Sequence, residues 1–273
     1  MQYINKLFNL ENKVAVLTGG GGVLACSMAE GLLQSGVTVI LLDLDKDNLT
    51  CVLGSLYKQG TVRVKSCNVL VKADLEKVRD EILEEFGRID ILINCAGGNM
   101  AGATIGPDQT IFDVKMDDFQ KVVDLNLNGS VLPSLVFGQV MANQSEGTII
   151  NMSSMAADRV ITRVVGYSAS KAAITNFTKW MSVELAQKFG DGIRVNAIAP
   201  GFFIGNQNKK LLLNDDGSYT DRGNTIINNT PMKRFGEAKE LIGATLFLCS
   251  DSAKFITGVV LPVDGGFSAF SGV

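Results

Sequence analysis

The sequence contains no histidine among its 273 residues, and this absence excludes several kinds of catalytic site. Without histidine there is no Ser-His-Asp triad, no Cys-His nucleophile pair, no zinc site with a histidine ligand and no imidazole proton shuttle. Cysteine is scarce as well, since Cys26, Cys51, Cys67, Cys95 and Cys249 are the only five and show no CxxC spacing. An odd number of dispersed cysteines is typical of reduced, packed thiols, and no metal site is expected.

Long apolar runs and an excess of positive charge are also missing. No apolar stretch reaches the roughly 18–20 residues that a membrane span requires. Residues 1–13 carry charges and amides where a secretion signal has an apolar core. The net charge of −3 and the pI of about 5.1 give no basic surface for nucleic acid or anionic lipid. The composition therefore predicts a cytoplasmic protein that binds neither nucleic acid nor membranes.

What the chain does contain is a regular alternation of short apolar runs and helical patterns. Strands are expected at residues 14–18, 37–43, 61–68, 90–94, 148–152, 193–198 and 259–263. Helices are expected at residues 23–35, 46–58, 73–86, 115–141, 167–189 and 238–248. Most of the strand segments are continuously apolar, as in a parallel sheet that is covered on both faces. This order predicts an α/β fold, with a single Rossmann-like domain over residues 1–273 and a doubly wound parallel sheet of about seven strands with helices on both faces.

Residues 202–230 interrupt this alternation with a long polar connection that is rich in asparagine. A connection of this length in a compact domain is usually functional, although a tolerated surface insertion is the alternative. We expect residues 202–230 to form a substrate-binding lid.

A glycine-rich loop follows the first expected strand. The loop comprises Thr18, Gly19, Gly20, Gly21, Gly22, Val23 and Leu24. Gly20, Gly22 and Ala25 have the G-x-G-x-x-G/A spacing that lets a backbone approach a pyrophosphate at the start of a helix. Methyltransferases that use S-adenosylmethionine have a similar loop, so the loop alone does not identify the ligand.

Asp43 ends the second expected strand, 24 residues after Gly19. A carboxylate at this place accepts hydrogen bonds from the ribose diol of adenosine and repels a 2′-phosphate. No arginine or lysine follows Asp43 until Lys46. The sequence therefore predicts NAD (NADH) as the cofactor in preference to NADP, while a solvated strand end or a helix cap remains the alternative for Asp43.

Tyr167 and Lys171 lie four residues apart in an expected helix, so their side chains share one face. A phenol has an ordinary pKa near 10, and a neighbouring cation lowers it toward the range of useful acid–base catalysis. Ser154 ends the preceding expected strand, thirteen residues before Tyr167. Its hydroxyl suits a hydrogen bond to a substrate oxygen, although serine at a strand end is also a common turn residue.

Together these residues resemble the short-chain dehydrogenase/reductase family, and the resemblance extends from Leu10 to the C-terminus. The matching motifs, in the family's order, are the loop at 18–25, Asn94-Cys95-Ala96-Gly97, Asn126 in LNLNG, Ser154, Tyr167-x-x-x-Lys171, Pro200-Gly201 and Val263-Asp264-Gly265-Gly266. One departure is that Val23 and Ala25 stand at the last two glycines of the family's TGxxxGxG loop. This departure leaves the phosphate contacts open.

The resemblance implies a role for each catalytic position. Tyr167 would act as the general acid or base, and Lys171 would lower its pKa and bind the nicotinamide ribose. Ser154 would polarise the substrate oxygen. Asn126 would hold a water molecule that links Lys171 to solvent.

The resemblance also implies a set of cofactor contacts. Asn68 stands where the family usually has an aspartate against the adenine, and an amide still accepts a hydrogen bond there. Pro200 and Gly201 would lie beside the nicotinamide carboxamide. The implied cofactor-binding residues are Thr18, Gly19, Gly20, Gly22, Val23, Leu24, Asp43, Asn68, Val69, Asn94, Ala96, Gly97, Tyr167, Lys171, Pro200, Gly201 and Phe203.

Within the family, residues 19–24, 96–99, 200–203, 206–208 and the tail 264–273 are similar to those of the D-mannonate oxidoreductases, which interconvert D-mannonate and D-fructuronate with a nicotinamide cofactor. The expected substrate contacts are Asn99, Ser154, Arg163, Asn206 and Gln207. A sugar acid also needs a cation for its carboxylate. The candidates are Arg159, Arg163, Lys209, Lys210 and Arg222, each of which is also typical of a solvated surface charge.

Two other interpretations stay open at this point. One is a different reductase of the same chemistry, such as a gluconate 5-dehydrogenase-like enzyme or a 3-oxoacyl-thioester reductase. The other is a non-catalytic dinucleotide-binding regulator, which has little need of Tyr167 and Lys171 together. The resemblance further implies a homotetramer in which the helices at 115–141 and 167–189 pair across subunits.

Overall fold

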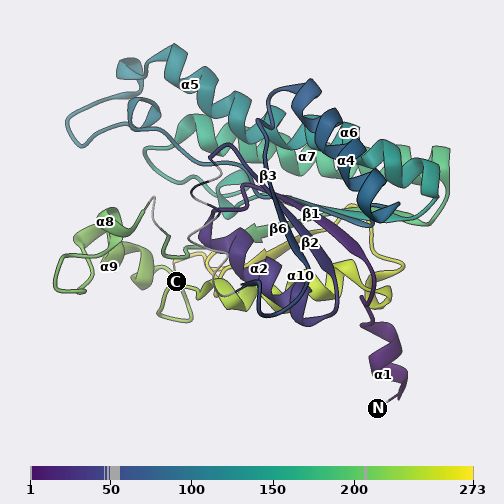
Figure 1. Ribbon diagram of the computed structural model, residues 1–273. Helices are drawn as coiled ribbons and strands as arrows, with labels where there is room; N and C mark the ends of the chain where they lie inside the picture. The colour runs from purple at the N-terminus through teal and green to yellow at the C-terminus, as the bar shows by residue number, and fades with distance from the viewer. Residues whose placement is uncertain (1, 46, 48, 50–55, 206–207, 273) are drawn as a thin grey trace.

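The computed structural model describes residues 2–45, 47, 49, 56–205 and 208–272 (Figure 1). Its centre is one seven-stranded sheet with the order β3-β2-β1-β4-β5-β6-β7. The strands are β1 (Val14–Thr18), β2 (Thr38–Asp43), β3 (Val62–Ser66), β4 (Ile91–Asn94), β5 (Gly147–Met152), β6 (Ile193–Pro200) and β7 (Val260–Val263). Every pairing between neighbouring strands is parallel. The strand order reverses between β1 and β4, and ligands of doubly wound sheets bind at the carboxyl ends of the strands beside such a reversal.

Helices cover both faces of this sheet, as the sequence predicts. The main helices are α2 (Val23–Gln34), α4 (Lys72–Phe86), α5 (Met116–Val123), α6 (Gly129–Gln144), α7 (Val165–Phe189) and α10 (Leu241–Cys249). Figure 1 shows α2 and α10 below the sheet and α4, α6 and α7 above it. Ala15 and Leu17 of β1 pack toward the first layer, and Val14 and Val16 pack toward the second. Because every strand residue of β1 meets a helix layer, its sequence is continuously apolar.

The expected helix at 115–141 is wrong in one respect, because a π-turn interrupts it. Residues Asp124–Asn128 form this turn (η3) between α5 and α6. A π-turn adds a residue to the helical ladder and is frequent at functional sites. Here it places the side chain of Asn126 in the interior, with 0% of its surface exposed.

The polar connection at 202–230 contains two short helices that its composition does not predict. These are α8 (Lys209–Leu212) and α9 (Asp221–Asn228). Leu212, Ile226 and Ile227 form a small apolar cluster with Phe235, separate from the main core. Thr220 caps α9, since its hydroxyl accepts a hydrogen bond of 3.1 Å from the Gly223 amide. In Figure 1 this unit lies at the side of the sheet, next to the C-terminus.

Several shorter elements complete the chain. They are α1 (Gln2–Leu7) and the 3₁₀ turns η1 (Ala101–Ala103), η2 (Ile111–Asp113), η4 (Met155–Ala157), η5 (Ala238–Glu240) and η6 (Asp251–Ala253). Most of the helix expected at 46–58 lies outside the described residues. Within the described part of the chain, none of the helices has the length and apolar character of a membrane span.

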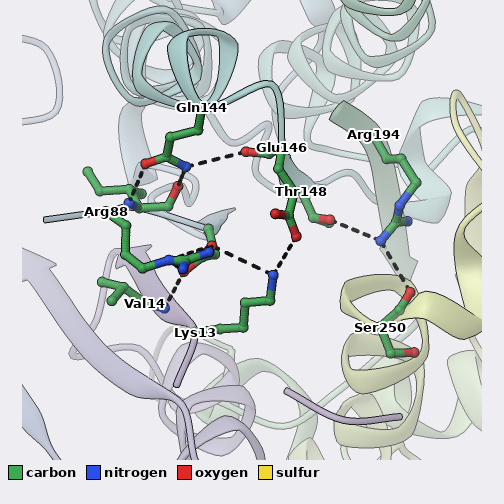
Figure 2. A network of polar contacts seen from close by, with 10 residues as sticks. Lys13, Val14, Arg88, Gln144, Glu146, Thr148, Arg194 and Ser250 are labelled. Atoms are coloured by element: carbon green, nitrogen blue, oxygen red, sulfur yellow. Dashed lines mark hydrogen bonds and ion pairs between the residues drawn. The ribbon is translucent and has the colours of Figure 1, made fainter. Parts of the chain in front are cut away.

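A network of charges ties the strands together at their amino ends (Figure 2). Asp90, just before β4, is 3% exposed and accepts a hydrogen bond of 2.8 Å from the Val14 amide. The Arg88 guanidinium binds both oxygens of this carboxylate, at 2.5 and 2.9 Å. The Lys13 ammonium lies 3.8 Å from Asp90 and 2.5 Å from Glu146. We call Lys13, Arg88, Asp90 and Glu146 the amino-edge network, in which each charge faces an opposite charge.

Candidate active site

The glycine-rich loop lies between the carboxyl end of β1 and the start of α2. Gly19 has a left-handed backbone with φ of 63°, and a Cβ atom there would lie 2.8 Å from the Cα of Ala96. Helix α2 begins at Val23, so Val23 and Ala25 belong to its first turn. Its cap residue, Gly22, offers no side-chain acceptor to the first amides. A helix start with free amides is suited to an anion such as a pyrophosphate.

Asp43 is joined directly to this loop. One of its carboxylate oxygens accepts a hydrogen bond of 2.9 Å from the Gly21 amide, and the other accepts one of 3.3 Å from the Asp45 amide. The carboxylate is half-buried at the end of β2 and lies beside the helix start. This placement fits the ribose diol of a dinucleotide whose pyrophosphate binds the loop. The amides at the helix start and the Asp43 carboxylate therefore suit the pyrophosphate and the ribose of NAD, the cofactor that the sequence predicts.

Residues at the ends of β1 and β4 fix the two strands against each other. The Thr18 hydroxyl accepts hydrogen bonds of 3.1 Å from the amides of Cys95 and Ala96. The Asn94 amide group donates to Ser134 and Asn151 at 2.8 Å each. Thr18 and Asn94 are both fully buried, so their side chains hold the strand ends in place.

Gly97, Asn126 and Lys171 meet at one point near the end of β4. The Asn126 amide group donates to the carbonyls of Gly98 and Val122 at 2.6 and 2.8 Å, and its oxygen accepts from the Gly98 amide at 3.1 Å. A Cβ atom on Gly97 would lie 2.7 Å from that oxygen and 3.5 Å from the Lys171 nitrogen. Only glycine therefore fits at position 97 without a shift of its neighbours.

Lys171 projects from α7 into the interior and is 4% exposed. Its ammonium donates a hydrogen bond of 2.7 Å to the Met152 carbonyl at the end of β5. Burial lowers the pKa of Lys171 to about 8. The ammonium also lies 5.4 Å from the centre of the Tyr167 ring. The predicted pairing of Tyr167 and Lys171 on one helix face is therefore present.

Tyr167 differs from the sequence expectation in the direction of its pKa. Burial raises the pKa of Tyr167 above its usual value, and a hydrogen bond with Ser154 opposes that rise. The expectation considered only the cation at Lys171, whereas the loss of solvent around the phenol is the larger effect. The phenol is accordingly protonated at neutral pH.

The two serines after β5 have different surroundings. Ser153 is buried, and its hydroxyl lies 2.7 Å from that of Thr175 in α7. The Ser154 hydroxyl accepts a hydrogen bond of 3.1 Å from the Ala156 amide and also contacts Tyr167. Ser154 is therefore the serine that shares an environment with the phenol.

The remaining predicted cofactor positions also lie after the carboxyl ends of strands, but the Phe203 side chain faces the core. Gly201 follows β6 and donates its amide to the Val263 carbonyl at 2.9 Å. Asn68 accepts a hydrogen bond of 3.0 Å from the Leu70 amide through its side-chain oxygen. Val69 is buried beside it. The Phe203 side chain is buried in the main core, so its ring is not presented at the surface of the site.

The predicted substrate residues form a looser group. The Asn99 amide donates to the Thr104 hydroxyl at 2.6 Å, and the Arg163 guanidinium donates to the Ile105 carbonyl at 2.7 Å. Both therefore belong to the surroundings of the segment after β4. Asn206 and Gln207 lie outside the described residues. The carbonyl of Met152, which holds Lys171, is a contact that the sequence does not reveal because it is a backbone atom.

Comparison with known proteins gives the family. A family model described as "Enoyl-(Acyl carrier protein) reductase" matches residues 22–268. The chain is 44% identical to a Haemophilus influenzae protein named "Uncharacterized oxidoreductase", over 97% of this chain and 96% of the relative. It is 43% identical to "Uncharacterized oxidoreductase UxuB" of Bacillus subtilis, over 97% of this chain and 98% of the relative.

A solved structure agrees with these relatives. A "putative D-Mannonate oxidoreductase" from Haemophilus influenza, crystallised with bound NAD, is 44% identical and superposes with a TM-score of 0.90. The match covers 97% of this chain and 98% of that one. The fold class and the family resemblance predicted from the sequence are thereby confirmed. The chain belongs to the short-chain dehydrogenase/reductase family and is an oxidoreductase.

Proposed function

We propose that this protein is an NAD-dependent oxidoreductase that interconverts a hydroxyl and a ketone on a sugar acid, with D-mannonate and D-fructuronate as the substrate pair. The observation that carries the proposal is the cluster of Ser154, Tyr167 and Lys171 at the carboxyl ends of the strands, beside a glycine loop joined to Asp43. The 44% identical NAD-bound protein named for D-mannonate supports the choice of substrate and cofactor.

The cofactor would bind along the edge from β2 to β6. The glycine loop and the start of α2 would hold the pyrophosphate, and Asp43 would accept hydrogen bonds from the adenosine ribose. A carboxylate there disfavours the 2′-phosphate of NADP. Lys171 would bind the nicotinamide ribose. When bound, the nicotinamide supplies or accepts the hydride, and the protein provides position and proton transfer.

Tyr167 performs the proton transfer in this mechanism. Because burial keeps the phenol protonated, it is ready to donate its proton to a ketone oxygen during reduction. Ser154 donates a second hydrogen bond to the same oxygen and thereby polarises the carbonyl. Lys171 stabilises the phenolate that remains, and Asn126 orients the path by which the proton is replaced. In the oxidation direction the same groups act in reverse.

We also propose that the protein is a homo-oligomer, as the family resemblance implies for its long helices. The exposed surface of α6 and α7 carries Leu135, Trp180 and Val183, each more than half exposed in the single chain. Large apolar side chains that are exposed in a single chain favour contact with another protein surface. Light scattering on the purified protein tests this, and a monomer would contradict the proposal.

The oxidation of NADH with D-fructuronate, followed by absorbance, tests the function. The same assay includes 5-keto-gluconate, an acetoacetyl thioester and NADPH. Rapid turnover of D-fructuronate with NADH alone is the expected result. Activity with another member of the panel would keep the mechanism and replace the substrate. Inactivity toward the whole panel, with tight NADH binding, would favour a regulatory protein.

A further inference from the structure

The arginines of the described chain divide into two groups by their partners. Arg63, Arg79, Arg88 and Arg234 each form an ion pair with a carboxylate. Arg159, Arg163, Arg194 and Arg222 have no carboxylate ion pair among the described residues and bind backbone carbonyls instead. Arg194 is buried in β6, whereas the other three lie in the segment before α7 and at the start of α9.

Arg163 and Arg222 belong together within this second group. The Arg222 guanidinium donates to the carbonyl of Thr162, the residue before Arg163, at 3.4 Å. Burial and the charge of Arg163 both lower the pKa of Arg222. Two half-buried guanidinium groups of like charge thus interact, and neither forms an ion pair with a carboxylate of the described chain. Such an arrangement is unfavourable alone and becomes favourable when an anion binds.

The backbone of Arg163 supports a specific need for this side chain. Its φ of 79° is in the left-handed region, where glycine is the favoured residue. Two contacts hold it there, since its carbonyl accepts from the Ile105 amide at 3.0 Å and its guanidinium donates to the Ile105 carbonyl at 2.7 Å. Strained positions of this kind cluster at functional sites.

A cavity lies beside Arg222, and Thr162, the residue before Arg163, is part of its wall. Its volume is about 340 Å³, and its walls include Arg159, Phe202, Arg222, Asn229 and Phe267. Residues 159–162, which form one wall, lie in the segment that connects Ser154 with Tyr167. Phe202 directly follows Gly201 at the end of β6. The cavity is thus lined by segments that adjoin the proposed catalytic residues in the sequence, and its size lies in the range of small-molecule sites.

We propose that Arg163 and Arg222 bind the carboxylate of the substrate between them and so make a negative charge a condition of substrate binding. This inference rests on the proposed function, in which Tyr167 acts on a hydroxyl of a sugar acid. Guanidinium groups bind carboxylates through paired, charge-assisted hydrogen bonds. A neutral polyol would leave the two charges unpaired, and this penalty would exclude it.

The test compares Arg163→Met and Arg222→Met with the wild type on D-mannonate and on its amide, which has the same carbon skeleton without the charge. For each variant we expect KM for D-mannonate to rise about 30- to 100-fold, as for loss of a charge-assisted hydrogen bond, with a much smaller change in kcat. Turnover of the amide should change less than about threefold, so the preference for the acid is lost. Arg234→Met is the matched control, because Glu240 already neutralises this nearby arginine.

Calorimetric binding of D-mannonate to the NADH-loaded enzyme is a second readout that needs no turnover. Binding that is lost in both variants supports the inference. Equal binding by the wild type and the variants overturns it, and so does a wild type that does not bind D-mannonate. Binding through the two arginines without oxidation would overturn the proposed function alone. Thermal unfolding of the ligand-free variants shows that they are folded, with a small decrease in Tm for Arg163→Met because it loses the hydrogen bond to the Ile105 carbonyl.

Discussion

Asp90 and Lys171, two buried charged residues at opposite edges of the sheet, differ in how their charge is compensated. At the amino edge, the Asp90 carboxylate is 3% exposed and is neutralised by Arg88 and Lys13. At the carboxyl edge, Lys171 is 4% exposed, and its ammonium donates a hydrogen bond to the carbonyl of Met152. The charges of Asp90, Arg88 and Lys13 neutralise one another within the protein. A buried ammonium such as that of Lys171 has no counter-ion in the described chain and can be stabilised by a bound ligand. Functional sites differ from structural charge networks in this respect.

Topology explains why the difference follows the two edges. In a parallel sheet the carboxyl ends of all strands meet at one edge, where the connections to the following helices begin. The loop after β1, the segment after β4 and the residues after β5 and β6 therefore lie together. Substitutions at the amino edge should change stability, and substitutions at the carboxyl edge should change activity. The predictions below test this separation, beginning with the largest effect.

Asp90→Ala should lower the free energy of unfolding by about 3 kcal/mol, because it removes the buried partner of Arg88 and the acceptor of the Val14 amide. Urea denaturation measures this loss. Glu146→Ala is the control: its side chain is 58% exposed, so it should cost less than about 1 kcal/mol. The folded Asp90→Ala enzyme should keep its KM for NADH. A changed KM with unchanged stability would break the separation of the two edges.

Tyr167→Phe should show the reverse behaviour, with turnover reduced at least about 100-fold, or about 2.7 kcal/mol, through loss of the general acid. NADH binding, measured by fluorescence, should persist because the glycine loop and Asp43 are untouched. Tyr57→Phe at an exposed position is the control and should leave turnover unchanged. Near-normal turnover by Tyr167→Phe would remove this residue from the mechanism.

The elements that carry the site are those that the sequence predicts best. Strand β1 matches its expected range because its apolar run is buried on both faces. Tyr167 and Lys171 meet on one helix face because their spacing is a local property. The π-turn around Asn126 escaped prediction, since a shift in backbone hydrogen bonding leaves no mark in hydrophobic periodicity.

The remaining differences arise from contacts between distant segments. The direction of the Tyr167 pKa depends on burial, which spacing along a helix does not reveal. Helix α9 was missed because the polar residues of 202–230 obscure the few apolar positions, such as Ile226, that pack together. The approach of Arg222 to Thr162 joins residues 60 positions apart. Long-range geometry of this kind, more than composition, defines the substrate side of the site.

Asp43→Ala separates cofactor binding from substrate binding at the carboxyl edge, because it should change only the preference between NADH and NADPH. The preference for NADH over NADPH should fall about tenfold, or about 1.4 kcal/mol, because the carboxylate no longer binds the ribose diol or repels a 2′-phosphate. The ratio of kcat/KM for the two cofactors measures this change. The neighbouring Asp45→Ala should leave the ratio nearly unchanged. KM for the sugar acid should also stay constant, and an unaltered cofactor ratio would refute the ribose contact.

The smallest effect is a pH dependence of stability that Lys171 alone should produce. Burial lowers its pKa from 10.5 to about 8, so above pH 8 the folded protein holds fewer protons at this site than the unfolded chain does. Stability rises with pH wherever the unfolded state binds more protons. The Lys171 contribution to the free energy of unfolding should therefore increase by roughly 0.7 kcal/mol between pH 7.5 and 8.5.

Urea denaturation of the wild type and of Lys171→Met across this range isolates the contribution, because every other titrating group is common to both proteins. The wild type should gain stability relative to the variant as pH rises, since deprotonation relieves the cost of a buried ammonium without a counter-ion. Parallel curves would mean that the ammonium is well solvated or paired in solution. Lys171 would then resemble Asp90 in having its charge compensated in the folded protein.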